Sequence, residues 1–268
     1  MMSLFYLVMV ALVQGITEFL PISSSGHLVL LPALTGHVDQ GLLIDVAAHV
    51  GTLGAVILYF WSDVRVAVGG IPALLKGRIY EPGASLTLCL AIATVPVIVA
   101  GLILSVLGIS DAMRSVAVIG WSTIIFGLFL WFFDKRSAEI RTAPEWTVKH
   151  ALIMGLWQVI ALIPGTSRSG ITITGGRSLG YTRTDAAKLS MLMSIPTIIA
   201  SGTLLSLDLV GATDAGLMRD AAIVAALSLV AALLALKLMF RLLQSVSFTP
   251  YVIYRLVLGA ALLIWAYT

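Results

Sequence analysis

Charged side chains are scarce in this sequence. Asp, Glu, Lys and Arg make up 11% of its 268 residues, whereas a soluble domain carries about 25%. The mean hydropathy is +1.05, and 59% of the residues are hydrophobic. Such a chain cannot cover its surface with polar side chains. The composition therefore predicts one all-α integral membrane domain over residues 1–268 and excludes a soluble protein.

Two further features are missing. The single cysteine, Cys89, excludes an intramolecular disulfide and a cysteine metal cluster. The 16 Lys and Arg stand singly between apolar runs and form no basic patch, so we do not expect a nucleic-acid partner. The first basic residue is Arg65, and a cleaved signal peptide would begin with a positive region. We expect the first apolar run to belong to the mature chain.

Apolar runs are abundant, and six are long enough to cross a bilayer, which takes about 20 residues. Two others are too short or interrupted. Residues 4–20 contain Gln14 and Glu18 and end in PISSSGH, while residues 151–163 end in PGTSRSG. We predict that both are re-entrant helix pairs, which enter the membrane, break at proline and glycine, and return. The six expected spans are 42–61, 85–108, 116–133, 184–205, 221–242 and 250–267.

The basic residues predict a topology, because Lys and Arg in short loops mark the cytoplasmic side. The polar connection 62–84 carries three of them and the connection 134–149 carries four, so both are expected inside. The termini, the loop near Asp111 and the loop 206–220 then lie outside. In this arrangement the first broken segment enters from the outside and the second from the inside.

This opposition suggests an internal repeat. ALVQGITEFLP (11–21) matches ALIMGLWQVIALIP (151–164), and DVAAH (45–49) matches DAAKL (185–189), both at an offset of 140 residues. We predict an inverted-topology repeat, with the first copy over about 1–136 and the second over about 147–268. Many transporters build a polar site near the membrane midplane from such repeats and their broken helices.

The second break has the composition of an anion site. It offers hydroxyls, glycines that let a ligand approach the backbone, and the guanidinium of Arg168, whose fork suits phosphate. The helix that follows adds the positive end of its dipole. The simpler interpretation is that serine and glycine only cap the broken helices and that Arg168 pairs with Glu18.

The first break offers a carboxylate, hydroxyls and an imidazole. Glu18 has Gln14 one turn earlier on the same helical face, and it either neutralises Arg168 or holds a divalent cation through oxygen ligands. In the run 23–25, serine hydroxyls precede His27, which could accept a proton from one of them. The other histidines, His37, His49 and His150, lack such neighbours and are expected to be structural or interfacial.

These segments resemble one family. QGITE with PISSSGH, PGTSRSGIT and the SMLMSIPT stretch look like the signatures of the undecaprenyl-pyrophosphate phosphatases, the bacitracin-resistance membrane phosphatases. The resemblance implies catalytic roles for Glu18, Ser24, His27 and Arg168, and a metal site of Mg or Ca at Glu18 and Gln14. The first acidic position is Glu or Gln in that family, and in this sequence it is Gln14. The expected phosphate-binding residues are Ser23, Ser25, Gly26, Gly165, Thr166, Ser167, Ser169 and Thr172.

The resemblance also implies the reaction. The enzyme would remove the terminal phosphate of the C55 polyprenyl pyrophosphate, with Ser24 or water as nucleophile, and so recycle the lipid carrier of bacterial cell-wall synthesis. The expected location is the inner (plasma) membrane, with the site open to the periplasmic face and membrane lipids around it. The sequence is compatible with a homodimer. A secondary transporter remains the alternative, although a carrier does not need hydroxyls beside an imidazole.

Overall fold

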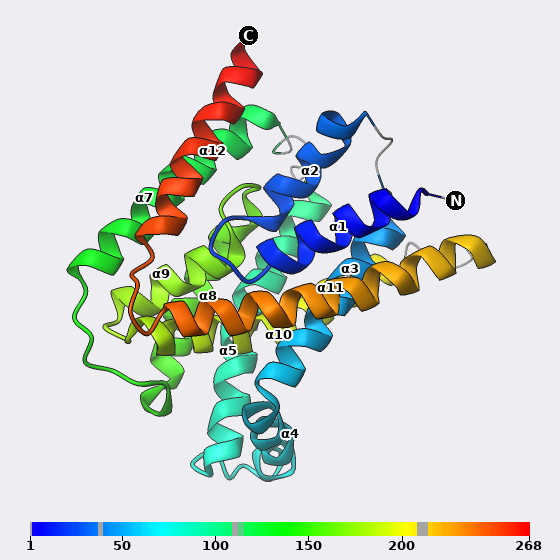
Figure 1. Cartoon of the computed structure of the whole chain (residues 1–268). Helices are drawn as coiled ribbons and strands as arrows, with labels where there is room; N and C mark the ends of the chain where they lie inside the picture. Colours follow the sequence, from blue (N-terminus) through cyan, green and yellow to red (C-terminus); the bar gives the residue numbers. More distant parts are fainter. Residues whose placement is uncertain (1, 37–39, 109–112, 114, 208–213) are drawn as a thin grey trace.

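The computed structural model describes the whole chain except residues 1, 37–39, 109–112, 114 and 208–213 (Figure 1). The described part is helical, with one isolated bridge between Arg141 and Tyr181. The predictions for His37 and Asp111, and for part of the loop 206–220, lie outside the described residues. The elements are α1 (Leu4–Thr17), α2 (Ser24–Thr35), α3 (Leu42–Tyr59), α4 (Trp61–Leu75), α5 (Pro82–Val106), α7 (Val116–Arg136), η1 (Ala143–Glu145), α8 (Val148–Val159), η2 (Ile160–Leu162), α9 (Arg168–Ser178), α10 (Arg183–Leu207), α11 (Ala215–Leu242) and α12 (Thr249–Tyr267).

Six of these helices are long and apolar enough to cross a membrane: α3, α5, α7, α10, α11 and α12. They coincide with the six runs expected from the sequence, so that prediction is confirmed. Helix α1 and the segment Val148–Leu162 are apolar but shorter than a span, as the sequence also indicates. The chain is therefore an all-helical, multi-pass membrane protein.

The connection 62–84 differs from the simple polar loop that the sequence suggests. It contains helix α4, which buries Ala67 and Gly70 and packs along α5. A Cβ at Gly70 would lie 2.0 Å from the carbonyl carbon of Gly83. Two glycines thus let the backbones of α4 and α5 touch, and these helices form the hairpin at the bottom of Figure 1.

The short helices pack on spans that lie far away in the sequence. Helix α1 packs along α11, and α8 packs along α5, while α7 and α12 run side by side at the left of Figure 1. A Cβ at Gly15 of α1 would lie 2.6 Å from the Cβ of Ala231, and one at Gly155 of α8 would lie 2.6 Å from the carbonyl oxygen of Ala93. Each short helix therefore uses one glycine to approach its span.

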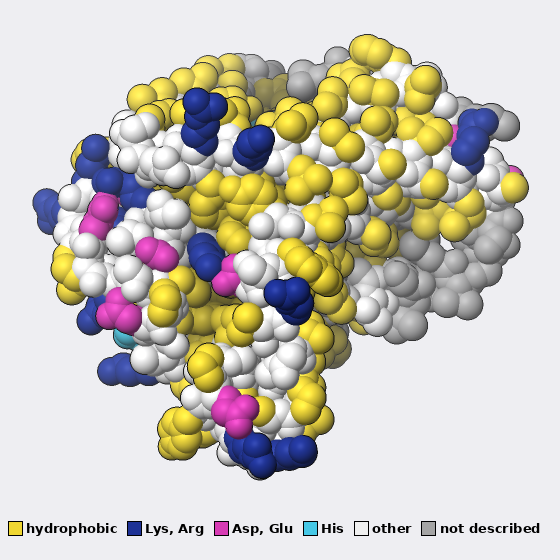
Figure 2. Space-filling model, turned by 60° about the horizontal axis from the view of Figure 1, so that its bottom comes forward, with side chains coloured by type: hydrophobic (Ala, Val, Ile, Leu, Met, Phe, Trp, Pro, Cys, Tyr) yellow, Lys and Arg dark blue, Asp and Glu magenta, His cyan; other side chains and the backbone are white. Residues whose placement is uncertain are grey.

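The outer surface is apolar where a lipid environment would surround it. Exposed large side chains include Val99 of α5, Phe129 of α7, Leu234 of α11 and Val257 of α12. Figure 2 shows hydrophobic side chains spread over one face, with Lys and Arg clustered at its left edge and at the bottom and a few others standing singly across it. Inside, Phe19, Leu130, Met154 and other buried apolar residues form the main core, and α9 packs against α7, α8 and α10.

Candidate functional site

The two breaks have the same backbone conformation. Ser23 has φ 73° and Ser167 has φ 70°, and within the described residues they are the only non-glycine residues with positive φ. Each serine caps the helix that follows, since its Oγ accepts a hydrogen bond from the backbone N–H of Gly26 (3.4 Å) or Gly170 (3.1 Å). Non-glycine residues adopt this conformation only where the surroundings impose it, often at functional sites.

Arg255 of α12 holds both breaks in place. Its side chain is fully buried, and its guanidinium donates to the carbonyl oxygens of Thr123 (3.0 Å), Pro21 (3.3 Å) and Thr166 (2.8 Å). One cation therefore binds a carbonyl of α7 and carbonyls of both breaks. The break carbonyls need such a partner because those segments are not helical. Sequence analysis did not single out Arg255. The available signal was an arginine inside an apolar span.

Helix α7 fixes the second break from the other side. The hydroxyl of Ser122 donates to the carbonyl oxygen of Pro164, and that of Thr123 donates to the carbonyl oxygen of Gly165 over 3.2 Å. Gly165 has φ 88°, and a Cβ there would lie 2.3 Å from the Ser122 hydroxyl oxygen. Only glycine fits this position, because any side chain would meet both the wrong backbone conformation and α7.

A cavity of about 190 Å³ lies where the two breaks meet. Several predicted site residues line it, from both breaks: Glu18, Ser23, Ser24, Ser25, Ser167 and Arg168. Segments about 150 residues apart in the sequence therefore form one site. Helix α3 adds His49 to the lining, and α10 adds Thr197 and Ser201, none of which the sequence pointed to as a site residue.

Glu18 connects the groups around this cavity. Its Oε1 accepts a hydrogen bond from Arg168 over 2.7 Å, and its Oε2 accepts bonds from the Ser24 hydroxyl over 2.7 Å and from Gln14 over 3.0 Å. The carboxylate is buried. The structure therefore contains the Glu18–Arg168 ion pair that was one of the two expectations for these residues.

Arg168 uses only part of its guanidinium in this pair. Its second terminal nitrogen, Nη1, is buried and has no acceptor among the described residues. Arginine presents its N–H groups in a planar fork that matches phosphate oxygens. Because Arg168 also lines the cavity, it can keep Glu18 on one nitrogen and bind an anion through the other.

The two histidines near the site do not lie where the sequence suggests. His27 does not line the cavity. Its Nδ1 is 2.6 Å from the carbonyl oxygen of Ser23 and its Nε2 is 2.6 Å from the hydroxyl of Tyr254, and the His27 and Tyr254 rings stack. His49 lines the cavity instead, with Nε2 3.8 Å from Glu18 Oε2.

The hydrogen bonds also fix the tautomers of these rings. A carbonyl oxygen only accepts, so Nδ1 of His27 carries the hydrogen and its Nε2 accepts from Tyr254. In His49, Nδ1 donates to the carbonyl oxygen of Asp45 over 2.7 Å, so Nε2 is the ring nitrogen that faces Glu18. His150 contacts the Tyr181 hydroxyl over 2.7 Å, away from the cavity.

The remaining predicted residues form the support behind the cavity. Gln14 is buried, and its Oε1 has no donor among the described residues. The hydroxyl of Ser169 donates to the carbonyl oxygen of Leu20 over 2.9 Å, which ties α9 to the first break. Thr172 shares a hydrogen bond of 2.6 Å with Ser190. The other supporting residues are Gly26, Gly165 and the buried Thr166, whose Oγ1 also lacks a partner within the described chain.

Oxygen atoms suited to a hard cation are present, although no group of three His, Cys, Asp or Glu exists among the described residues. The Glu18 carboxylate and the orphaned Oε1 of Gln14 belong to side chains that contact each other. Oxygen ligands are those that Mg²⁺ and Ca²⁺ take in proteins. Two adjacent side chains therefore carry oxygen atoms of the kind that a divalent cation takes.

Comparison with known proteins gives a consistent result over the full length. The family described as Bacitracin resistance protein BacA matches residues 7–261. An undecaprenyl-diphosphatase of Ruegeria pomeroyi is 63% identical over 267 residues, covering 100% of both chains. One from Maricaulis maris is 47% identical, covering 98% of this chain and 99% of the relative, and undecaprenyl-diphosphatase 1 of Rhodospirillum rubrum is 43% identical, covering 99% and 96%. The chain belongs to the BacA family of bacitracin resistance proteins.

Proposed function

We propose that this protein is an undecaprenyl-diphosphatase, which hydrolyses the terminal phosphate of undecaprenyl diphosphate and leaves the lipid monophosphate. Full-length relatives with 63% identity carry this name. The observation that carries the proposal is the buried Nη1 of Arg168, which has no acceptor among the described residues and belongs to a side chain that lines the same cavity as Ser24. A terminal phosphate would supply that acceptor.

The substrate phosphate would bind between the two helix N-termini. Ser23 and Ser167, the cap residues of α2 and α9, both line the cavity. The first backbone N–H groups of each helix have no partner within the helix, and its dipole favours an anion there. Together with Arg168, these donors stabilise the charge on a phosphoryl group in transfer, which is most of what this reaction requires.

Ser24 is the proposed nucleophile. Its Oγ attacks the terminal phosphorus, an Oγ–P bond forms, and the bond from that phosphorus to the bridging oxygen breaks. The lipid monophosphate leaves with the electron pair, and the hydroxyl proton passes to Glu18 Oε2, which already accepts the Ser24 hydrogen bond. Water then hydrolyses the phosphoserine, releases inorganic phosphate and returns the hydroxyl. Direct attack by water is the alternative.

The sequence predicts that His27 accepts this proton, but the geometry favours Glu18. The Nε2 of His27 already accepts the Tyr254 hydroxyl, whereas Glu18 contacts Ser24 directly. His27 then acts as a positioning residue, because its Nδ1–H holds the carbonyl of Ser23. A divalent cation held by Glu18 and the Oε1 of Gln14 would neutralise phosphate charge when bound.

The re-entrant and repeated architecture is part of the proposal. The matched serine conformations of the two breaks support it, as do Gly15 and Gly155, each of which packs on a span from the other half of the chain. In this arrangement the first copy is about 1–136 and the second about 147–268, with α4 as an addition to the first. The homodimer stays a prediction.

We further propose that the site opens to the periplasmic face of a bacterial plasma membrane. The α4–α5 turn and the C-terminus lie at opposite ends of the molecule in Figure 1. This is expected if the turn is cytoplasmic and the C-terminus is outside. The basic residues at the bottom of the face in Figure 2 support the same orientation.

The test is phosphate release from undecaprenyl diphosphate by the purified protein. We expect Arg168→Ala to lower kcat/KM by about 10²–10³-fold or more, because it removes a charged donor from the transition state. Arg65→Ala, an exposed arginine on α4, is the matched control and should stay within about twofold. A wild-type protein that binds the lipid but releases no phosphate would favour the transporter alternative.

A further inference from the structure

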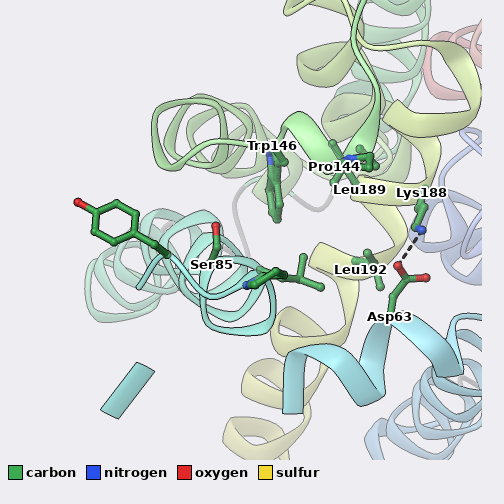
Figure 3. A pocket seen from close by; sticks show the side chains of 11 residues that line it. Asp63, Ser85, Pro144, Trp146, Lys188, Leu189 and Leu192 are labelled. Carbon is green, nitrogen blue, oxygen red and sulfur yellow. Dashed lines mark ion pairs between the residues drawn. The ribbon is translucent and has the colours of Figure 1, made fainter. Parts of the chain in front are cut away.

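A second, larger cavity lies on the side of the α4–α5 hairpin. Its volume is about 380 Å³, within the range of small-ligand pockets. The walls come from the start of α4, the start of α5, the η1 turn and the first half of α10 (Figure 3). It shares no lining residue with the first cavity, which we call the serine cavity because Ser23, Ser24, Ser25 and Ser167 line it. Along α10, Leu189 and Leu192 line this cavity, whereas Thr197 and Ser201 line the other.

Two opposite charges line this cavity. Lys188 Nζ is 2.7 Å from Asp63 Oδ1, as the dashed line in Figure 3 marks. The side chains are 31% and 23% exposed, so a ligand can reach them. Their ion pair leaves two ammonium hydrogens and several carboxylate lone pairs unused within the described chain. The pair can therefore bind one negative and one positive group of the same ligand.

Trp146 supplies an unused hydrogen-bond donor. Its side chain is 6% exposed, and its Nε1 has no acceptor among the described residues. Figure 3 shows the ring extending from the η1 side toward the space between α5 and α10. Buried indole N–H groups normally have an acceptor, so an acceptor from outside the chain fits here.

The rest of the cavity suits hydrocarbon. Leu86, Leu189, Leu192 and the Trp146 ring form an apolar wall next to these polar groups. The nearby connection 76–81 carries Lys76 and Arg78, and the sequence predicts it at the cytoplasmic surface. A ligand bound near that expected membrane surface would place its apolar part in the membrane and its head group at the membrane surface. A phospholipid has this arrangement.

The charges select among head groups. A free phosphate or an anionic head group would bring negative charge next to Asp63 without using it. A quaternary ammonium cannot donate a hydrogen bond to the carboxylate. A primary ammonium linked to a phosphate uses every group: the ammonium binds Asp63, while the phosphate oxygens bind Lys188 and the Trp146 N–H.

We propose that the cavity lined by Asp63, Trp146 and Lys188 is a binding site for a phospholipid whose head group carries both a primary ammonium and a phosphate. The site lies apart from the serine cavity and does not depend on the function proposed for it. Binding there would tie α4, α5 and α10 together, since each contributes a wall.

The experiment measures lipid retention by native mass spectrometry. Delipidated protein is titrated separately with phosphatidylethanolamine, phosphatidylglycerol, phosphatidylcholine and free phosphoethanolamine. For the wild type, we expect one phosphatidylethanolamine bound at least about tenfold more tightly than each of the other three. Such a factor corresponds to the loss of one charge-assisted hydrogen bond.

Three variants locate the site. The double variant Asp63→Asn with Lys188→Met should abolish the preference for phosphatidylethanolamine over the other ligands. Trp146→Phe keeps an aromatic ring but removes the N–H, and it should weaken phosphatidylethanolamine retention about five- to tenfold. The control is Arg78→Gln with Glu81→Gln, which removes an exposed ion pair of the same connection and should keep wild-type retention. Tighter binding of phosphatidylglycerol, equal binding of free phosphoethanolamine, or unchanged phosphatidylethanolamine retention in Trp146→Phe would each overturn the proposal. The single Trp146→Phe change keeps the test decisive if the charge variants unfold.

Discussion

Glu18 is the residue on which the serine cavity depends. It accepts hydrogen bonds from Ser24, Gln14 and Arg168, so one buried carboxylate orients the proposed nucleophile and neutralises the arginine that is proposed to bind phosphate. A buried pair of this kind contributes little net stability when intact, but removing one partner leaves an uncompensated charge. Chemistry and stability at this residue are therefore coupled, and different variants separate them.

The first prediction concerns Glu18 and the cation. We expect Glu18→Gln to lower the free energy of unfolding by up to about 3–5 kcal/mol, because Arg168, whose side chain is 15% exposed, is left without its partner. Glu18→Gln with Arg168→Gln should recover part of that stability but no turnover. Thermal unfolding in detergent and phosphate release measure the two effects.

Chelation provides the complementary measurement. Excess EDTA should abolish turnover of the wild type without lowering its unfolding temperature by as much as Glu18→Gln does, because the ion pair with Arg168 remains. Full activity in the chelator would reduce Glu18 to a partner of Arg168 and of the nucleophile.

The second prediction concerns Ser24. Ser24→Ala should lose at least about 10³-fold in kcat but retain substrate binding, because Arg168 and the backbone donors remain. Rapid quench of the wild type with substrate labelled in the terminal phosphate should trap a phosphoserine that Ser24→Ala lacks. Ser62→Ala, at an exposed serine of α4, is the control. Near-normal turnover of Ser24→Ala would instead indicate direct attack by water.

At the scale of helices, glycine contacts set the positions of the two breaks. Gly15 brings α1 against α11, and Gly155 brings α8 against α5. The breaks follow directly after these short helices, so a shift in either crossing would move Glu18 or Arg168. Arg255 then joins the two breaks through their carbonyls. The site is therefore held by helix packing as well as by its own hydrogen bonds.

The third prediction tests these crossings. Gly15→Val and Gly155→Val should each destabilise the protein by about 1–3 kcal/mol, because the added atoms meet Ala231 or the backbone of Ala93. Gly69→Ala of α4, where a Cβ meets nothing within 4 Å, should be neutral or slightly stabilising. Unfolding temperatures in detergent provide the comparison. A neutral result at both Gly15 and Gly155 would contradict the close packing.

At the scale of the whole molecule, the two halves of the chain interlock. The short helix of each half packs on a span of the other, and both halves contribute one wall of the serine cavity. The serine cavity therefore forms only where the two halves pack together. The proposed inverted repeat also makes orientation testable, because it puts equivalent segments of its two copies on opposite sides of the membrane.

The fourth prediction is this orientation. In a Cys89→Ala background, Ser3→Cys should react with an impermeant thiol reagent in intact cells, and Ser137→Cys should react only after permeabilisation. The reason is that Ser3 lies at the N-terminus, expected outside, while Ser137 lies in the basic connection expected inside. Labelling of position 137 in intact cells, or protection of position 3, would rule out the proposed topology.

The sequence by itself determined the spans, the two breaks and the pair of charges between them. Hydropathy over 20 residues and the local effects of proline and glycine are properties of short segments. A carboxylate and a guanidinium at membrane depth need each other or a ligand, so Glu18 and Arg168 could be predicted to matter.

Only the tertiary structure decided which side chains face the cavity. His27 and His49 are each a single histidine in an apolar segment, so the sequence does not distinguish them. The packing of α2 and α3 against their neighbours places His49, and not His27, in the lining of the serine cavity. Arg255 contacts Pro21 from 234 residues away, and no local pattern carries that contact. The same holds for the Asp63–Lys188 cavity, because its walls come together only when α4, α5 and α10 pack.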